Sequence, residues 1–431
     1  MKVLVIGSGG REHALCYSFK HDPRVTQLYC ASGNAGIAGI AECVPIRPDD
    51  ISSLADFAAM NAIDLTFVGG EIPLALGIVD LFESRGLKII GPCREASMLE
   101  SSKSFAKDFM ARKGVPTAKF TTSHSPAFAI LELESGDFGG IDSPVVVKAD
   151  GLAAGKGVVV AKDRADAVEA INEMAALVGT AAAEKIILEE CLFGREVSLL
   201  MFVDGEQFVL MPPVRDHKRI GEGDTGPNTG GMGTITDESL LSADELQVIK
   251  DRIIRPTLHG CEREGFRYRG ILFLGLMMTA DGPKLLEYNV RFGDPETQAI
   301  LVRLETSLVD ICEAMLSGDL DSITIDWRPG ASACVVLAAE GYPSKPTTGD
   351  VIRGIDEAGS IAGIEVFHAG TSFAHLSGET TAAEPSLVTS GGRVVGVTAS
   401  GNDLAAAVAT AYSAVEKISF DGMQYRKDIG N

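Results

Sequence analysis

The chain has 431 residues, 45% of them hydrophobic, and its 38 basic and 59 acidic residues give a formal charge of -21. This length predicts about two to four domains, and the acidic balance excludes the long basic surface of a nucleic-acid-binding protein. No segment approaches the ~20 consecutive apolar residues of a membrane span, so no membrane role is expected. The 8 cysteines are scattered without a C-x-x-C pair, which is typical of a reducing compartment, so we expect a cytoplasmic protein.

Residues 2–90 alternate short apolar strands with helices, which predicts βαβ units and a parallel sheet. Strands are expected at 3–6, 27–31, 64–68 and 88–90, and helices at 12–20, 51–60 and 74–85. Polar or glycine-rich loops follow the strands at 7–11, 32–36, 69–73 and 91–92. Ligands of such sheets bind at these carboxyl-end loops.

A helix at 101–113 leads into a region of longer strands that extends to about residue 310. Strands at 145–148, 158–161, 185–190, 197–203, 208–211, 271–278 and 284–292 predict a mostly antiparallel sheet with helices on one side. Strands at 331–338, 348–352, 364–368 and 393–399, followed by a helix at 404–417, predict a small α+β domain at the C-terminal end.

The first glycine-rich loop, Gly7 to Glu12, follows a strand and opens a helix, so its free amides and the helix dipole suit a phosphate. A tight structural turn and a dinucleotide site are the alternatives. The dinucleotide fingerprint needs a third glycine where this chain has Glu12.

A second glycine-rich loop, at 149–157, lies between two strands and carries Lys156, and Lys148 directly precedes it. It favours closure over a triphosphate, with a mobile hairpin as the alternative. The apolar strand that ends in Glu189 and Glu190 then offers backbone groups to an adenine and a carboxylate to a ribose.

The strand at 284–292 places Glu287, Asn289 and Arg291 on one face, because successive strand side chains alternate. Glu and Asn oxygens suit Mg²⁺ on nucleotide phosphates, and Arg291 can meet the transferred charge. A solvated face of an amphipathic strand is the alternative. The long polar stretch at 216–233 is predicted to be a structureless loop that binds substrate, with disorder as the alternative.

Together these segments resemble the phosphoribosylamine-glycine ligase family, also called glycinamide ribonucleotide synthetases, of the ATP-grasp superfamily. The shared motifs span the chain in family order: GSGGREHA from Gly7, SGNAG from Ser32, KADGLAAGKGV from Lys148, DHKR from Asp216, DTGPNTGGMG from Asp224, RFGDPETQ from Arg291, FHAGT from Phe367 and RKDIG from Arg426.

The resemblance implies an α/β and α+β multidomain fold. A parallel-sheet (pre-ATP-grasp) domain at 1–104 would bind phosphoribosylamine, an ATP-grasp domain would span 105–322 with a small mobile lid at about 121–190, and a C-terminal α+β domain would span 323–431. It also implies ATP and Mg²⁺ or Mn²⁺ as cofactors, small molecules as partners, and a monomer or weak homodimer.

The resemblance carries site residues over onto matching positions. The catalytic residues would be Asp216, Lys218 and Arg291, and the metal ligands Glu287 and Asn289. The ATP-binding residues would be Lys103, Lys148, Gly155, Lys156, Glu189, Glu190, Leu192 and Glu196. The substrate-binding residues would be Gly9, Gly10, Arg11, Glu12, Gly33, Asn34, Glu71, Pro73, Asp224, Gly231 and Met232.

The chain departs from the family pattern at three places. Arg215 replaces the usual Gln before DHKR, Thr234-Ile235 replaces Ala-Tyr after GGMG, and the G-P-E-x-P loop has Gly70 in place of its first proline. The first two touch the substrate loop, and the third puts a flexible residue beside Glu71.

The activity implied by the resemblance is ATP-dependent ligation of glycine to 5-phosphoribosylamine through glycyl phosphate, a step of purine biosynthesis. Another ATP-grasp enzyme with a different acceptor, such as a carboxylase using bicarbonate, is the closest alternative. A nucleotide-binding sensor without catalysis is a second alternative, which the joint presence of Lys148, Glu287, Asn289 and Arg291 disfavours.

Overall fold

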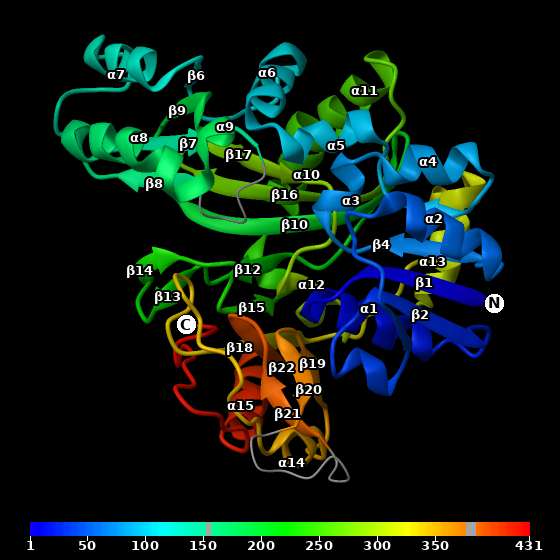
Figure 1. Ribbon diagram of the computed structural model, residues 1–431. Coiled ribbons are helices and arrows are strands. Elements are labelled where there is room, and N and C mark those ends of the chain that lie inside the picture. Colours follow the sequence, from blue (N-terminus) through cyan, green and yellow to red (C-terminus); the bar gives the residue numbers. More distant parts are fainter. Residues whose placement is uncertain (152–156, 376–384) are drawn as a thin grey trace.

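The computed structural model describes residues 1–151, 157–375 and 385–431. The N-terminal domain is a parallel sheet in the order β3-β2-β1-β4-β5, at the right of Figure 1. Its strands are β1 (Lys2–Gly7), β2 (Gln27–Ser32), β3 (Glu42–Val44), β4 (Leu65–Val68) and β5 (Ile89–Ile90). Its helices are α1 (Gly10–Lys20), α2 (Ile51–Met60), α3 (Glu71–Ala75) and α4 (Ile78–Ser84), with a 3-10 turn at Ile37–Gly39.

The parallel sheet confirms the βαβ prediction, with two differences. The helix expected at 74–85 is interrupted, because Gly77 adopts a left-handed conformation (φ 86°) between α3 and α4. The third strand, β3, was not predicted, because it has only 3 residues and no clear alternation.

A small antiparallel sheet, in the order β6-β9-β7-β8, lies at the upper left of Figure 1. Its strands are β6 (Phe120–Ser123), β7 (Val145–Ala149), β8 (Val158–Ala161) and β9 (Ile186–Glu190). The helices of this part are α7 (Pro126–Glu134), α8 (Arg164–Val178) and α9 (Thr180–Ala183), and α7 and α8 share one apolar core with the sheet.

A large antiparallel sheet crosses the middle of the molecule in the order β17-β16-β10-β12-β15-β18-β22-β19, with β11 paired to β10 (Figure 1). Its strands are β10 (Arg195–Asp204), β11 (Gln207–Leu210), β12 (Val214–Asp216), β15 (Gly233–Thr236), β16 (Arg269–Thr279), β17 (Gly282–Asn289), β18 (Ala331–Ala338), β19 (Ile364–His368) and β22 (Arg393–Gly401). The expected C-terminal domain therefore shares a sheet with the preceding part through the β15–β18 pairing.

The remaining elements cover these sheets or form two short hairpins. The helices are α5 (Arg94–Ser101), α6 (Lys103–Lys113), α10 (Ala243–Ile249), α11 (Arg255–Arg263), α12 (Glu296–Leu301), α13 (Leu308–Ser317), α14 (Ile355–Gly359) and α15 (Leu404–Val415), with a π turn at Lys250–Ile254 and 3-10 turns at Glu238–Leu240 and Leu320–Ser322. The hairpins are β13 (Arg219–Gly221) with β14 (Thr225–Asn228), and β20 (Thr371–Ala374) with β21 (Ser386–Thr389).

Two sequence predictions of this region are wrong. The stretch at 216–233 is not structureless, because it contains the β13–β14 hairpin. The strand expected at 348–352 is reduced to a single bridge between Val351 and Val388. Among the described residues, no helix is both long and apolar enough to cross a membrane.

The N-terminal sheet and the large sheet share a core at Phe292. The Phe292 ring stacks on Phe67 of β4 at 6.0 Å and meets Phe202 of β10 edge-on at 6.1 Å. All three rings belong to one buried cluster, and the only tryptophan, Trp327, packs against that cluster. The segment that follows β17 is thereby held between the two sheets.

We expect Phe292→Ala to destabilise this junction by about 3–5 kcal/mol, because it removes a buried ring that two sheets share. Urea unfolding monitored by the fluorescence of Trp327 measures this loss. Phe128→Ala is the control, since Phe128 is 62% exposed and its truncation should change stability by less than about 0.5 kcal/mol. Equal effects of the two substitutions would contradict the shared core.

Candidate active site

The loop after β1 is organised around the carboxylate of Glu12. Glu12 Oε2 accepts the Gly9 amide at 2.6 Å, and Glu12 Oε1 pairs with Arg11 Nε at 2.6 Å. A Cβ on Gly7 would lie 2.4 Å from Glu12 Cδ, and one on Gly69 would lie 2.1 Å from Glu12 Oε1. Two glycines therefore make room for a buried carboxylate, which orients Arg11 towards the carbonyl oxygen of Phe292 at 3.1 Å.

Arg291 joins three segments that lie far apart in the sequence. Its Nη2 lies 2.7 Å from Glu100 Oε1 and 3.2 Å from Asn289 Oδ1, and its Nε lies 3.3 Å from Glu71 Oε2. Burial raises the pKa of Glu100. Burial would also raise the pKa of Glu71, but Arg291 and Arg11 outweigh it and lower that pKa. The predicted substrate and catalytic residues Arg11, Glu71 and Arg291 thus lie in one charged cluster.

Glu287 lies on β17 after an irregularity in its pairing with β16. Glu287 pairs with Gly275 while Leu285 pairs with Leu276, so Leu286 is an inserted residue that breaks the expected alternation. Burial alone would raise the pKa of Glu287, but the ammonium groups of Lys218 and Lys148 outweigh it and lower this pKa. Glu287 is therefore a carboxylate facing several cations.

The donor set fits a divalent cation on a nucleotide. No group of three or more His, Cys, Asp or Glu that could hold a metal occurs in the described ranges. Glu287 and Asn289 offer two protein oxygens, which suits Mg²⁺ because this ion is bound by one or two protein ligands together with phosphates and water. An ion retained by the protein alone would need more ligands than this.

The predicted ATP residues come from α6, the small sheet and β10. Lys148 Nζ lies 2.8 Å from Glu189 Oε1, and Lys103 Nζ donates to the Gly151 carbonyl oxygen at 2.8 Å. Glu196 pairs with Lys218 at 3.1 Å, whereas Glu190 pairs with Lys284 at 3.1 Å. Leu192 lies on the irregular connection between β9 and β10, and Gly155 and Lys156 lie outside the described residues.

The substrate loop is divided between two environments. Asp216, at the end of β12, has a buried Oδ1 without a hydrogen-bond partner in the described structure, and burial and the nearby Glu296 raise its pKa. A Cβ on Gly231 would lie 2.8 Å from this Oδ1, and Met232 is buried beside it. Asp224 instead pairs with Arg426 Nη1 at 2.7 Å, and its side chain is 70% exposed. Asp224 is therefore separated from the cluster in this conformation.

The C-terminal domain completes the loops of the N-terminal domain. Asn34 Nδ2 donates to the carbonyl oxygens of Ser8 and His368, both at 2.8 Å, and His13 Nδ1 accepts the His368 amide at 2.8 Å. Burial, reinforced by His368, lowers the pKa of His13 to about 3, and burial lowers the pKa of His368 to about 4. The FHAGT motif is thus fixed against the SGNAG motif by the Asn34 amide, and against the GSGGREHA motif by the neutral imidazole of His13.

Some predicted residues shape the backbone of the site, and some charged residues near the site were missed. Pro73 is buried in α3, and Gly10 begins α1. Gly33 has a left-handed φ of 78°, and a Cβ built on it would lie 2.3 Å from Cys43 Sγ. Glu100, Lys107 and Arg393 were not predicted. Each is a single charged residue without a motif of its own, and only the fold brings Glu100 to Arg291, Lys107 to Glu189 and Arg393 to Asp294.

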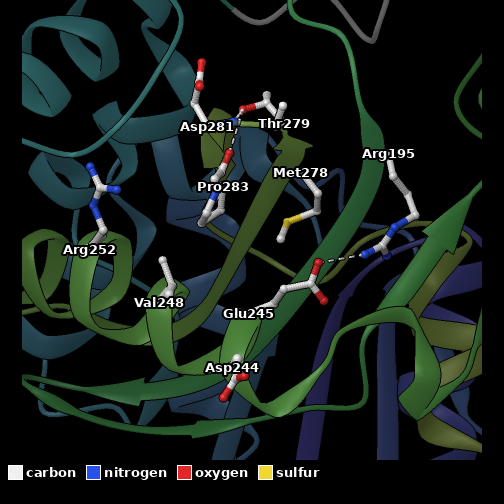
Figure 2. Close-up of a pocket in the computed structure, with 11 residues that line it drawn as sticks. Arg195, Asp244, Glu245, Val248, Arg252, Met278, Thr279, Asp281 and Pro283 are labelled. Atoms are coloured by element: carbon white, nitrogen blue, oxygen red, sulfur yellow. Dashed lines mark hydrogen bonds and ion pairs between the residues drawn. The ribbon is translucent and has the colours of Figure 1, made fainter.

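A separate pocket opens at the far ends of β16 and β17 (Figure 2). None of its 11 lining residues is a predicted site residue. Arg195 points into it and pairs with Glu245 at 3.0 Å, whereas the next residue of β10, Glu196, points to Lys218. The alternation of β10 therefore separates this pocket from the candidate active site.

Comparison with known proteins identifies the family. The chain matches three models described as phosphoribosylglycinamide synthetase N domain over residues 1–100, ATP-grasp (A) domain over 101–297 and C domain over 332–431. The chain belongs to the phosphoribosylglycinamide synthetase family. It is 45% identical over 430 residues to the phosphoribosylamine-glycine ligase of Caldanaerobacter subterraneus subsp. tengcongensis, covering 100% of this chain and 99% of that one.

Solved structures agree with this assignment. A phosphoribosylamine-glycine ligase from Thermotoga maritima superposes with a TM-score of 0.84 at 33% identity, over 100% of both chains. The biotin carboxylase domain of Hydrogenobacter thermophilus 2-oxoglutarate carboxylase, in complex with MgADP and bicarbonate, superposes with a TM-score of 0.70 at 17% identity, over 98% of this chain and 91% of that one. The second likeness shows a common fold alone.

We expect acid to weaken the contact between His13 and His368. Their folded-state pKa values of about 3 and about 4 lie below the 6.5 of an exposed histidine, so the unfolded chain binds more protons below pH 6.5. The stability they confer is complete above pH 6.5 and is lost as the pH falls, by about 2 kcal/mol per histidine at pH 5.

Unfolding at pH 7 and pH 5 tests this expectation with His13→Asn as the matched variant. Asn offers an acceptor oxygen to the His368 amide but does not titrate, so the variant should lose part of the acid sensitivity. An unchanged difference between the two pH values in the variant would show that His13 does not contribute.

Proposed function

We propose that the chain joins glycine to 5-phosphoribosylamine at the expense of ATP, giving glycinamide ribonucleotide, ADP and phosphate in purine biosynthesis. The observation that carries this proposal is the cluster at the end of β17. There Glu287 and Asn289 lie beside Arg291, which contacts Glu71 of the N-terminal domain, while Lys148 and Lys218 face Glu287. A nucleotide-binding face and a sugar-binding face thus meet at one strand.

The roles follow the elements that carry the residues. We assign Lys103, Lys148, Glu189, Glu190, Leu192 and Glu196 to ATP, together with Gly155 and Lys156, and Glu287 and Asn289 to Mg²⁺ or Mn²⁺. We assign the loops of Gly9 to Glu12, Gly33-Asn34, Glu71 and Pro73, and Asp224 with Gly231 and Met232, to the phosphoribosylamine and glycine. We divide the chain at 104 and 322, and take the segment at about 121–190 as a mobile lid.

The chemistry requires an activated carboxylate, because a carboxylate is a poor electrophile. Glycine accepts the γ-phosphoryl group of ATP and becomes glycyl phosphate, and the amine of phosphoribosylamine then attacks the acyl carbon and releases phosphate. A divalent cation on Glu287 and Asn289 neutralises phosphate charge when bound. Arg291, fixed by Glu71 and Glu100, presents its guanidinium to the transferring phosphoryl group without reorganising.

The remaining groups position the second substrate. Arg11 is held by Glu12 and directed to the same region as Arg291, since both donate to the Phe292 carbonyl oxygen at 3.1 Å. The Oδ1 of Asp216 has no hydrogen-bond partner among the described residues, so it is available to an N–H of the incoming amine. Closure of the proposed lid over the site would exclude water from glycyl phosphate, which is hydrolysed easily. We further propose a cytoplasmic monomer or weak homodimer.

The acceptor decides between this function and a carboxylase. Phosphate release from ATP and Mg²⁺ is measured with phosphoribosylamine generated in the assay, in the presence of glycine, alanine, bicarbonate or no acceptor. We expect release only with glycine and the amine together. Release that depends on bicarbonate would favour the carboxylase, and no release under any condition would favour a nucleotide sensor.

We expect Glu287→Ala to lower turnover by about 10²-fold or more, because the transferring phosphate loses its bound cation and its fixed electrostatic environment. The fold should persist, and circular dichroism checks this. Glu313→Ala on α13 is the control, since Glu313 is more than half exposed and pairs with Arg24 at 3.5 Å, away from the site. Normal turnover of Glu287→Ala would overturn the site assignment.

A further inference from the structure

A buried cluster of two lysines and one glutamate connects α6 with the small sheet. Lys107 Nζ lies 2.9 Å from Glu189 Oε2, and Lys148 Nζ lies 2.8 Å from Glu189 Oε1. The three residues are 2%, 6% and 2% exposed in the order Lys107, Lys148 and Glu189. One carboxylate is thus shared by two ammonium groups, and the cluster carries a net positive charge away from water.

Lys107 has further partners on the main body of the molecule. It donates to Thr117 Oγ1 at 2.8 Å, and Thr117 Oγ1 donates to the Leu285 carbonyl oxygen on β17 at 2.6 Å. Thr117 and Leu285 also form a backbone bridge. Lys107 is therefore fixed to β17, two residues before Glu287, by contacts that do not involve the nucleotide residues.

Lys148 is held less completely. Among the described residues, its Nζ has Glu189 and, at 3.5 Å, the Leu286 carbonyl oxygen as partners. Lys148 belongs to the small sheet. Under the proposed function Lys148 binds a phosphate of ATP, so it must exchange its carboxylate partner for a phosphate. If Lys148 were the sole partner of Glu189, its movement to the phosphate would leave a buried carboxylate unpaired. The exchange would then be unfavourable.

Lys107 removes this obstacle. When Lys148 turns to a phosphate, Glu189 keeps an ion pair and a hydrogen bond to Lys107, so no buried charge is left unpaired. Without Lys107, Glu189 and Lys148 would form an isolated neutral pair that competes with the nucleotide. The helix also brings Lys103 and Lys107 to one face, because they are four residues apart.

We infer that Lys107 is a positioning residue for nucleotide binding, which retains Glu189 so that Lys148 is released to the phosphates of ATP. This inference rests on the proposed function, because it uses the assignment of Lys148 and Glu189 to ATP. Lys107 itself contacts neither the nucleotide nor the reacting atoms.

The test is the affinity of the full chain for a non-hydrolysable ATP analogue, measured by calorimetry at pH 7. We expect Lys107→Met to weaken binding about tenfold, because Lys148 then stays on Glu189. In the Glu189→Gln background the same change should have less than about a twofold effect, since the carboxylate through which Lys107 acts is gone. The control is Lys113→Met. Lys113 lies on the same helix as Lys107 and pairs with Glu264 at 2.8 Å, so this variant should bind like the wild type.

Kinetics give a second readout that a loss of fold would not mimic. The KM for ATP should rise in Lys107→Met while kcat and the KM for glycine change by less than about twofold, because a removed ground-state contact acts on binding. Analogue binding at wild-type affinity, or equal effects of Lys107→Met with and without Glu189, would overturn the inference while leaving the proposed function intact. A wild-type chain that does not bind the analogue would overturn both.

A measurement on the wild-type chain alone covers the case in which Lys107→Met does not fold. Burial, and after it the charge of Lys148 on β7, lower the pKa of Lys107 to about 8. Glu189 on β9 and Glu287 on β17 act in the opposite direction and raise this pKa. Between pH 7 and pH 9 Lys107 loses its charge, so affinity for the analogue should fall with a midpoint near that value. An affinity that stays constant over this range would contradict the role of Lys107.

Discussion

The ion pairs of Arg291 are the interaction on which the rest of the site depends. Arg291 and Phe292 are adjacent, so one points to carboxylates while the other enters the core between two sheets. The apolar contact of Phe292 fixes where the chain leaves β17, and this sets where the guanidinium meets Glu71 and Glu100. Packing energy thus supports an arrangement of charges that solvent would otherwise screen.

The burial of the Glu12 carboxylate explains two glycines of the N-terminal loops. Because Glu12 must lie buried between Arg11 and the Gly9 amide, neither Gly7 nor Gly69 can carry a Cβ. Glu12 takes the place of the third glycine of a dinucleotide fingerprint and occupies the amide that a pyrophosphate would use. The loop superficially resembles a dinucleotide-binding motif, but in the structure it holds Arg11 in a fixed direction.

The sequence predicts the elements well where pattern is local. Short apolar runs such as 158–161 and 331–338 have their predicted bounds, because β-branched and other apolar residues between turn signals are a strong signal. The break at Gly77, the inserted Leu286 and the pairing of β15 with β18 were not predictable, since they depend on tertiary contacts. Glu287, Asn289 and Arg291 were predicted as one polar face, whereas Glu100 and Lys107 were not, because a single charged residue on a helix has the pattern of a solvated surface.

The negative charge of the chain makes such single lysines important. With a formal charge of -21, the molecule as a whole repels a triphosphate, so binding depends on cations gathered locally. Lys103, Lys148 and Lys218 face Glu287, and Lys107 gives the cluster of Lys107, Lys148 and Glu189 a net positive charge. A buried lysine that never touches the ligand can therefore contribute to binding, because it determines which of its neighbours is free to do so.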